Sequence, residues 1–511
     1  MPERVLKKVK DNILVQWKIC FFAALIVGFF AHFYKLANWL PNWDSLVFRY
    51  DAQNMIGLGR WFLPVVCSVS SFYDLPFLNG LLSILFHAIG AVLICKIFDV
   101  KKGITAALIG AVIVSFPTVT SVMMYGYVAD GYGFSFMLSC MAAMYLTREK
   151  PNYIFSVILI MLSTAIYQAY ITVTIMLTLL YLINELIYRQ KEAVYMIKKS
   201  IKILISGVVG MGLYYLVLTI LLKLMGTELL EYQGMDSTAS LSNIDVWSSL
   251  YVIKHTLTDF FFDMSQGVNT FVILNCVIFA VTAIGYLTGA IKSRLNFQKA
   301  VLLCIYVLFL PIGSTALAFI NSAIDYHNLM VMGYSIFYIF FVLLYEHIPN
   351  NKNAGIKSWI ILIVGCFIII NQTVIANVSY HKAQMAYEKS YGTLIRIADR
   401  IEGTQGAELC SEILVIGALA DSKAYSVQLP PDMTGITDGY ILRADDETVG
   451  QSVLCSALND YCQKDYKFIF GERKQTFLQK DEIKEMSCWP SENCIVINDG
   501  VLVIKLGEAG E

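Results

Sequence analysis

Apolar residues in this chain gather in separate blocks of about twenty, the length that a helix needs to cross roughly 30 Å of hydrocarbon. The stretch 153–187 holds two such blocks or one long kinked element. We therefore expect a mainly α, polytopic helical membrane protein with about eleven transmembrane helices, whose ends the pattern defines to within about 2–4 residues. The expected spans are 14–36, 76–98, 104–123, 131–147, 153–169, 171–187, 203–224, 267–290, 299–319, 327–346 and 357–378.

The loops between these blocks alternate in basic charge. Lysines and arginines cluster before the first block and then in every second loop, and the positive-inside rule makes that side cytoplasmic. The N-terminus is then cytoplasmic, and the outer loops span 37–75, 124–131 and 225–266. The basic residues that set this orientation include Lys101, Lys102, Arg148, Lys150, Arg189, Lys191, Lys198, Lys199, Lys202, Lys292, Arg294, Lys299, Lys352 and Lys357.

The pattern changes after residue 378, where charged residues become frequent and long apolar runs stop. A helical periodicity covers 383–401, and short apolar runs at 413–416 and 468–470 predict buried strands. Residues 494–504 predict a hairpin, because Asp-Gly is a favoured turn between two apolar runs. We therefore divide the chain into a transmembrane domain, residues 1–378, and a small extracytoplasmic α/β domain, residues 379–511.

Composition agrees with a membrane protein. The 511 residues are 57% hydrophobic and only 15% charged, whereas about a quarter of the residues in a soluble chain are charged. The net charge of −1 gives no reason to expect nucleic acid as a partner. No small-residue cleavage site follows the first block, so we expect no cleaved signal peptide.

Five of the twelve cysteines lie in the C-terminal domain. An extracytoplasmic location permits disulfides, and Cys455/Cys462 and Cys488/Cys494 are close enough in sequence to pair, although spacing does not decide connectivity. No Cys/His set has zinc spacing, and we expect no metal site.

The first outer loop concentrates charge beside a membrane span. Residues 42–61 hold two carboxylates, two arginines, two tryptophans and a tyrosine, and charge at such a place marks a candidate functional site. Asp44 directly follows the first span, and a carboxylate in a partly dry crevice has the raised proton affinity of a general base. The alternative is a solvated loop aspartate. Asp51, seven residues on, either shares a helix face with Asp44 or pairs with Arg49.

Two arginines in the same loop are candidate phosphate ligands. The guanidinium forks of Arg49 and Arg60 suit phosphate oxygens, and the alternative is that they extend to the lipid headgroups. Gly57 and Gly59 would allow a tight turn before Arg60, but the surrounding residues do not form a phosphate-loop motif.

The second outer loop and the 153–187 region add aromatic and polar candidates. Asp130 is the single charge among tyrosines that include Tyr127. Ring faces stack on the C–H faces of sugars, and a carboxylate accepts hydrogen bonds from sugar hydroxyls. Alternatively, Asp130 caps the helix that follows. Gln168, beside Tyr167 near the outer end of a span, needs a hydrogen-bond partner.

Two further candidates lie on the outer side. His327, at the end of another span, would hold a phosphate or relay a proton, and the alternative is an interfacial histidine with satisfied hydrogen bonds. The long outer loop fits an amphipathic surface helix that could cover a lipid-linked substrate. Its charged positions are Lys254, His255, Asp259 and Asp263.

With these residues in order, the chain resembles the bacterial polytopic membrane glucosyltransferases of the serotype-converting type II kind, which decorate surface glycans and fall in the GT-C class. Two positions differ from the family's pattern: Ser45 follows Asp44 in place of a second acid, and His327 stands where an arginine is expected. The resemblance rests on Asn42-Trp43-Asp44 with Arg49, Leu58-Gly59-Arg60-Trp61, Asp130, Tyr167-Gln168 and the stretch from Ile495 to Leu506.

The resemblance implies a bacterial plasma-membrane enzyme with its active site at the outer face. The donor would be a polyprenyl-phosphate sugar, typically glucose, and the acceptor a cell-surface glycan. Asp44 would be the catalytic base of an inverting displacement, and Asp130 the second acid. Such a reaction needs no nucleotide or redox cofactor, and these residues do not demand a divalent metal. The substrate-binding candidates are Arg49, Asp51, Arg60, Tyr127, Tyr167, Gln168 and His327.

Three other classes of protein remain as alternatives. A flippase for lipid-linked sugars would have charges near the bilayer midplane and an internal repeat, but the charges here cluster at one face. A polymerase or acyltransferase acting on polyprenyl substrates is a second alternative, although no histidine lies in the acidic first loop. A non-catalytic assembly or receptor protein is the third, and it would tolerate loss of Asp44.

Overall fold

The computed structural model describes residues 13–42, 44–45, 55–230, 245–264, 267–319, 324, 326–349, 355–417, 419 and 449–508. These residues form two compact units. The helical unit contains the described residues up to 39 and from 55 to 378, and the sheet unit contains residues 40–45 and those from 379 onward.

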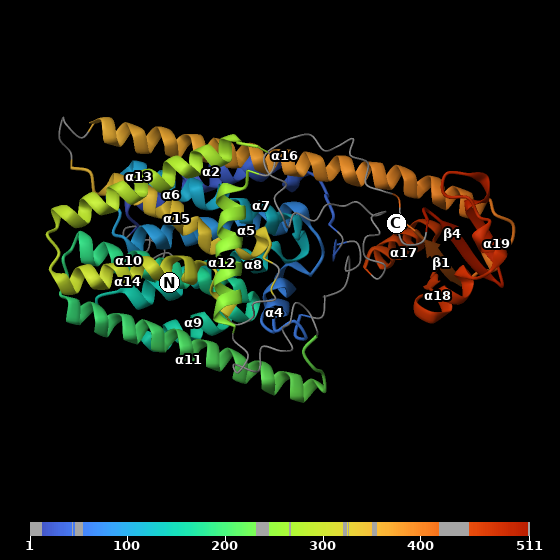
Figure 1. The fold of residues 1–511 in the computed structure, drawn as a ribbon, viewed down its shortest axis with the longest axis horizontal. Helices are drawn as coiled ribbons and strands as arrows, with labels where there is room; N and C mark the ends of the chain where they lie inside the picture. Colours follow the sequence, from blue (N-terminus) through green and yellow to red (C-terminus); the bar gives the residue numbers. More distant parts are fainter. Residues whose placement is uncertain are drawn as a thin grey trace, which may run out of the picture. The chain divides into compact units, whose positions relative to one another are not determined.

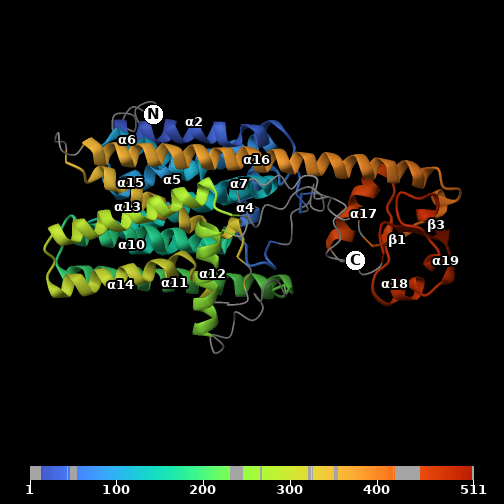
Figure 2. The ribbon, with the colours of Figure 1, turned by 45° about the horizontal axis from the view of Figure 1, so that its top comes forward.

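Long helices build the helical unit, and most of them lie side by side along a common direction (Figure 1). The shorter α12 runs across these helices, both in the view of Figure 1 and in the rotated view of Figure 2. The helices are α2 (Val15–Ala37), α4 (Leu63–Cys67), α5 (Pro76–Ile97), α6 (Gly103–Ser115), α7 (Pro117–Met124), α8 (Ala129–Thr147), α9 (Tyr153–Ile166), α10 (Ile171–Ile187), α11 (Ala193–Met225), α12 (Val246–Phe262), α13 (Thr270–Lys292), α14 (Phe297–Ser314), α15 (Ser335–Glu346) and α16 (Gly355–Glu402), which continues into the sheet unit.

Each expected span coincides with a helix or a pair of helices, but the count of eleven is not confirmed. Among the described residues, seven helices are long and apolar enough to cross a membrane, or eight if the bent pair α6 and α7 counts as one. The apolar helices α9 and α15 are shorter. The protein is therefore a multi-pass membrane protein. By length and apolarity, fewer of its described helices qualify as spans than the eleven expected.

Several expected spans are interrupted, either by a bend at a proline or by short 3-10 turns. Pro117 begins α7 after a 40° bend, since proline fits the first turn of a helix, where its missing N–H is not needed. Between α9 and α10, Tyr167 is extended and the 3-10 turn η3 (Gln168–Tyr170) follows, so 153–187 is two helices. The other turns are η1 (Ser68–Ser70), η2 (Gly126–Val128), η6 (Ala316–Phe319), η7 (Asn328–Met330) and η8 (Met332–Tyr334).

Small residues let the helices of this unit approach closely. α2 packs against α5 and α6, and α5 packs against α8. A Cβ atom on Gly110 of α6 would lie 2.2 Å from the carbonyl oxygen of Cys20 on α2, so only glycine permits this contact. Close backbone approach of this kind is the usual basis of helix association in a membrane, where apolar burial alone provides no drive.

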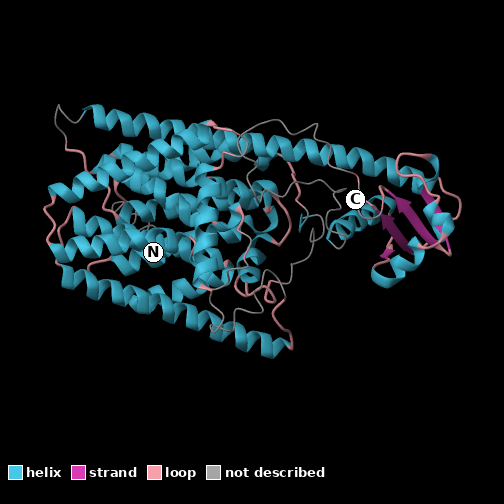
Figure 3. Ribbon diagram, in the orientation of Figure 1, coloured by secondary structure: helices cyan, strands magenta, loops and turns pink. Residues whose placement is uncertain are grey.

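The C-terminal part forms a small sheet covered by helices (Figure 3). The strand order is β2-β1-β4-β3, with β1 parallel to both β2 and β4. The predicted hairpin is confirmed, since β3 and β4 pair antiparallel across a turn in which Asp499 and Gly500 both have positive φ. The elements are β1 (Glu412–Ile416), α17 (Val449–Cys462), β2 (Lys467–Phe468), α18 (Gly471–Leu478), α19 (Asp481–Lys484), β3 (Ile495–Asn498) and β4 (Val501–Lys505), with 3-10 turns η10 (Ala407–Leu409) and η12 (Glu492–Cys494).

The structure differs from the sequence expectations for this region in two ways. The span at 357–378 and the amphipathic helix at 383–401 are one continuous helix, α16, because a change from apolar to polar residues does not end a helix. Cys455 and Cys462 are free thiols. They lie seven residues apart on α17, a rise of about 10 Å that exceeds the reach of a disulfide, about 7 Å between Cα atoms. Cys494 is a free thiol as well, and the thiol of Cys488 donates to the carboxylate of Glu508 at 3.3 Å, so the second expected pair is not formed either.

Candidate functional site

The segment before α4 makes a tight turn that presents Arg60. Gly59 has a φ of 74°, a conformation that glycine adopts without steric cost. The N–H of Gly59 bonds to the carbonyl of Ile56 at 2.9 Å, and the N–H of Arg60 bonds to the carbonyl of Met55 at 2.7 Å. The sequence predicted this turn from the two glycines, and the structure confirms it.

Side chains from distant helices hold the turn in place. The amide of Gln168 donates to the carbonyl of Leu58 at 2.9 Å and lies 3.1 Å from the hydroxyl of Tyr214 on α11. That hydroxyl donates to the carbonyl of Gly59 at 3.0 Å. The partner that Gln168 was expected to need is therefore the backbone that precedes Arg60.

Tyrosine rings surround the guanidinium of Arg60. Its Nη1 donates to the hydroxyl of Tyr132 at 3.1 Å, and its Cζ lies 4.8 Å from the ring centroid of Tyr167. The Tyr132 and Tyr167 rings stack at 4.6 Å with an angle of 25°. The hydroxyl of Tyr170 is buried without a hydrogen-bond partner among the described residues. We call Arg60, Tyr132, Tyr167 and Tyr170 the Arg60–tyrosine cluster.

The cluster places a permanent cation against aromatic faces. Cation–π contacts are worth about 0.5–2 kcal/mol, more where water is excluded. A guanidinium carries five N–H donors in a rigid fork that suits the oxygens of a phosphate or carboxylate. The arrangement is chemically suited to binding an anionic oxygen beside a sugar or other ring.

Asp130 lies in the first turn of α8 and is 2% exposed. The thiol of Cys67 lies 3.9 Å from its Oδ1, and the hydroxyl of Ser70 donates to the carbonyl of Cys67 at 3.1 Å. A carboxylate in this position is stabilised by the helix dipole. The N-cap of α8 is Val128 and no side chain caps it, so Asp130 lies inside the first turn and does not take the capping role considered in the sequence.

Asp130 and Arg60 belong to one local arrangement. Arg60 lies three residues before α4, whose other end carries Cys67 against Asp130. The helix α4 packs onto α8 at Gly131, where a Cβ would lie 2.5 Å from a methyl of Leu63. Tyr132, which bonds to Arg60, comes two residues after Asp130.

A charged group beside this arrangement was not predicted from the sequence. Lys35, in the last turn of α2, is 1% exposed, and Asp74 interacts with it electrostatically. Asp74 also accepts from the indole N–H of Trp39 at 3.1 Å, and its other oxygen is packed where Gly126 has no side chain. The available signal was a lysine inside an apolar block, which deserves a functional hypothesis by itself.

The second outer loop is built into the same end of the helical unit. Tyr127 is 2% exposed in η2 and thus lies within the packed protein. Asn79 on α5 donates to the carbonyls of Tyr73 and Gly126, both at 2.9 Å. These bonds tie η2, and with it the start of α8, to the end of the first outer loop.

His327 precedes η7, which packs against α7. The following turn η8 packs against η3 and α10, where Gly333 lies against Thr172. The segment that carries His327 therefore belongs to the end of the helical unit where η2 and η3 are found.

The segment that carries Asp44 belongs to the sheet unit, whereas the Arg60–tyrosine cluster belongs to the helical unit. The side chain of Asn42 accepts from the N–H and the hydroxyl of Ser45, both at 2.8 Å, and these bonds shape the backbone around Asp44. Asp44 itself is half-buried. Arg49 and Asp51 lie outside the described residues. No group of three metal-ligating side chains is found within the described part of the chain.

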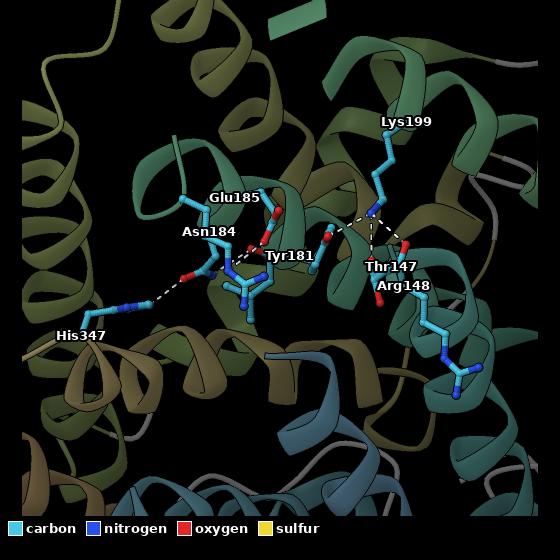
Figure 4. A network of polar contacts seen from close by, with 9 residues as sticks. Thr147, Arg148, Tyr181, Asn184, Glu185, Lys199 and His347 are labelled. Atoms are coloured by element: carbon cyan, nitrogen blue, oxygen red, sulfur yellow. Dashed lines mark hydrogen bonds and ion pairs between the residues drawn. The ribbon is translucent and has the colours of Figure 1, made fainter. Parts of the chain in front are cut away.

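A separate polar network ties helices together among the residues that the charge pattern predicts to be cytoplasmic (Figure 4). The ammonium of Lys199 on α11 donates to the carbonyls of Thr147 and Arg148 at 2.8 and 3.4 Å and to the hydroxyl of Tyr181 at 2.9 Å. The first two bonds satisfy carbonyls at the C-terminus of α8. Nearby, Glu185 pairs with Arg189 at 3.3 Å. Polar contacts therefore connect α8, α10 and α11 at this end of the helices.

The comparison with known proteins gives one match. The model of the family described as Glucosyl transferase GtrII matches residues 33–345. This range includes the Arg60–tyrosine cluster, Asp44, Asp130 and His327, and stops before α16. No curated protein and no solved structure matches the chain significantly.

Proposed function

Since the chain belongs to the GtrII family of glucosyl transferases, we propose that it transfers glucose from a polyprenyl-phosphate donor to a cell-surface glycan. The transfer takes place at the outer face of a bacterial plasma membrane, with the N-terminus cytoplasmic and the C-terminal domain extracytoplasmic. The architecture is of the GT-C type. The lipid tail of the donor lies among the membrane helices, and the acceptor arrives from outside.

The observation that carries this proposal is the Arg60–tyrosine cluster. Arg60 is held by a hydrogen bond to Tyr132 and by the ring of Tyr167, and its backbone turn is held by Gln168. A cation fixed before substrate arrives stabilises developing negative charge without reorganisation. In a polyprenyl-phosphate sugar that charge develops on the phosphate, and the tyrosine faces beside the guanidinium suit the sugar next to it.

The proposed reaction is a single displacement. An acceptor hydroxyl oxygen forms a bond to the anomeric carbon while the bond from that carbon to the phosphate oxygen breaks. The phosphate leaves with the electron pair and is held by Arg60, and the hydroxyl proton goes to a carboxylate. We assign this base to Asp44 because the family resemblance places the catalytic acid directly after the first helix. The anomeric centre is inverted.

The other candidates take supporting roles in this proposal. Asp130, beside the Arg60 turn, orients hydroxyl groups or keeps the start of α8 in place. The remaining binding residues contact the donor phosphate or the sugars, and the reaction uses no cofactor. These residues are Arg49, Asp51, Tyr127, Tyr167 and His327, whereas Gln168 acts by holding the turn before Arg60.

Transfer by matched variants tests the proposal. Full-length protein is reconstituted in lipid vesicles with undecaprenyl-phosphate [14C]glucose and surface polysaccharide from cells that lack the gene. We expect labelled polymer with the wild type and with Arg294→Ala, which removes an exposed arginine. Asp44→Asn should abolish transfer, and Arg60→Lys should raise the donor KM at least tenfold, because an ammonium lacks the fork.

Two outcomes would overturn parts of this proposal. Transfer by Asp44→Asn at the wild-type rate would show that another group is the base. If the wild type moved the labelled lipid across the bilayer without transferring glucose, the protein would be a flippase for lipid-linked sugars.

A further inference from the structure

The helix α12 is fixed to the helical unit by one face. The hydroxyl of Ser249 donates to the carbonyl of Ala318 at 2.8 Å, and the amide of Asn275 on α13 donates to the carbonyl of Phe261 at 3.0 Å. Ile253 and Phe261 are buried on this face, at 3% and 1% exposed. The second bond satisfies a carbonyl in the last turn, so α12 is anchored near both ends.

A row of four side chains runs along the opposite, exposed face. Trp247, Tyr251, His255 and Asp259 are spaced four residues apart, which aligns them along one side of a helix. Trp247 is 82% exposed and Tyr251 66%. The row spans twelve residues, or about 18 Å. We call these four residues the α12 row.

The members of the row contact one another. The rings of Tyr251 and His255 lie 5.7 Å apart, and the Nδ1 of His255 is paired with a carboxylate oxygen of Asp259. The side chains of His255 and Asp259 are 60% and 57% exposed. The row therefore presents two aromatic faces followed by an accessible donor and acceptor pair.

This order of groups matches the chemistry of an oligosaccharide. The apolar C–H faces of sugar rings stack on aromatic rings, and sugar hydroxyls exchange hydrogen bonds with imidazole and carboxylate groups. A bilayer suits Trp247 and Tyr251 but not the charged half of the row, because a carboxylate such as that of Asp259 is costly at hydrocarbon depth. The charged half therefore favours a glycan over lipid.

The helix α12 is connected to the Arg60–tyrosine cluster through two contacts. The rings of Phe260 and Phe261 each lie 5.3 Å from the ring of Tyr334. Tyr334 ends η8, which packs against η3, and η3 carries Gln168. The helix that carries the row is thus joined to the Arg60–tyrosine cluster through η8 and η3 within the helical unit.

We propose that the α12 row binds the acceptor glycan and holds sugar units next to the one that receives glucose. This inference rests on the proposed function, which makes a surface glycan the acceptor. The occupant is a neutral or weakly charged oligosaccharide, bound by stacking on Trp247 and Tyr251 and by hydrogen bonds to His255 and Asp259.

Binding without a donor tests the row by itself. The probe is the surface polysaccharide from cells that lack the gene, titrated onto full-length protein in nanodiscs. We expect Trp247→Ala and Tyr251→Ala each to weaken binding about tenfold, or about 1.4 kcal/mol. Trp359→Ala, which removes another exposed tryptophan at the start of α16, should bind as the wild type does. Folding is controlled by thermal unfolding, which the exposed substitutions should leave unchanged.

Kinetics and lipid quenching give the second arm. In the transfer assay the two row variants should raise the acceptor KM about tenfold while the donor KM and kcat stay at wild-type values. Equal affinity and equal KM in the variants would overturn the inference. Quenching of Trp247 fluorescence by brominated lipid, measured against Trp247→Phe, would also overturn it and assign the row to the bilayer.

The two proposals fail in different ways. If the wild type binds polysaccharide through the row but transfers no glucose, the proposed transferase function is wrong and the binding site remains. If glucose is transferred and the row variants behave as the wild type, only the assignment of the row is wrong.

Discussion

The side-chain amide of Gln168 donates a hydrogen bond to the backbone carbonyl of Leu58, 2.9 Å away and 110 residues earlier in the chain. This bond joins the break between α9 and α10 to the turn that presents Arg60. It gives a polar side chain inside the helical unit its partner, and it turns two separate sequence motifs into one site. The orientation of the Arg60 guanidinium thus depends on Gln168, which bonds to the backbone before Arg60 and makes no ion pair with it.

Gln168→Leu should therefore impair transfer without unfolding the protein. The variant leaves a buried carbonyl at Leu58 without its donor, at a cost of about 1–3 kcal/mol, and the turn before Arg60 loses its anchor. We expect kcat/KM to fall at least tenfold in the vesicle transfer assay, with most of the loss in the donor KM. Tyr214→Phe removes the bond to Gly59 and one acceptor of the Gln168 amide but keeps the bond from Gln168 to Leu58, so it should show a smaller loss. Wild-type kinetics in Gln168→Leu would show that the turn keeps its shape unaided.

Gly110 should be intolerant of even a methyl group. Gly110→Ala would place Cβ 2.2 Å from the backbone of Cys20, so α2 and α6 must separate. We expect a loss of about 1–3 kcal/mol in stability, the usual range for overpacking, seen as a lower midpoint of thermal unfolding in detergent. The matched control is Gly207→Ala on α11, where nothing lies within 4 Å and alanine should be neutral or stabilising. Equal midpoints for the two variants would contradict this packing.

Lys199 should contribute to the stability of the fold, whereas its neighbour Lys198 should not. Lys199→Met removes the donor to the carbonyls of Thr147 and Arg148 and to the hydroxyl of Tyr181. We expect a lower stability, by about 1–3 kcal/mol, in thermal unfolding. Lys198→Met changes the same residue type at an exposed position and should leave the midpoint unchanged. If both variants unfold together with the wild type, the network in Figure 4 does not support the helix ends.

Cys455 in the sheet unit should resist alkylation. Burial, with a smaller effect of Asp465, raises the pKa of its thiol to about 12. Because the reactive thiolate is disfavoured below that pKa, the neutral thiol dominates at pH 8. Mass spectrometry after iodoacetamide treatment of the native protein should find Cys488, which is half-buried, labelled well before Cys455. Equal labelling rates would show that the sheet unit opens readily around α17.

The local patterns of the chain predicted where most of its helices and the hairpin lie. Apolar blocks became helices because a segment crossing hydrocarbon must satisfy its own backbone hydrogen bonds, and this requirement is visible in a single stretch of sequence. The hairpin at Asp499-Gly500 formed for a similarly local reason, since few residue pairs adopt the turn. The likeness to glucosyl transferases was also visible, because short motifs at Asp44, Arg60, Asp130 and Gln168 occur in a recognisable order.

The continuity of α16 was not predictable from hydropathy, because polar residues sustain a helix as well as apolar ones do. The contacts of Arg60 with Tyr132 and Tyr167 join segments separated by 72 residues or more, and no pattern around Arg60 specifies them. The interaction of Lys35 with Asp74 is of the same kind. By itself the sequence determined which segments are helical and which chemistry is present. The tertiary structure decided which of those groups meet, because a site made of distant residues depends on helix packing that local preferences do not encode.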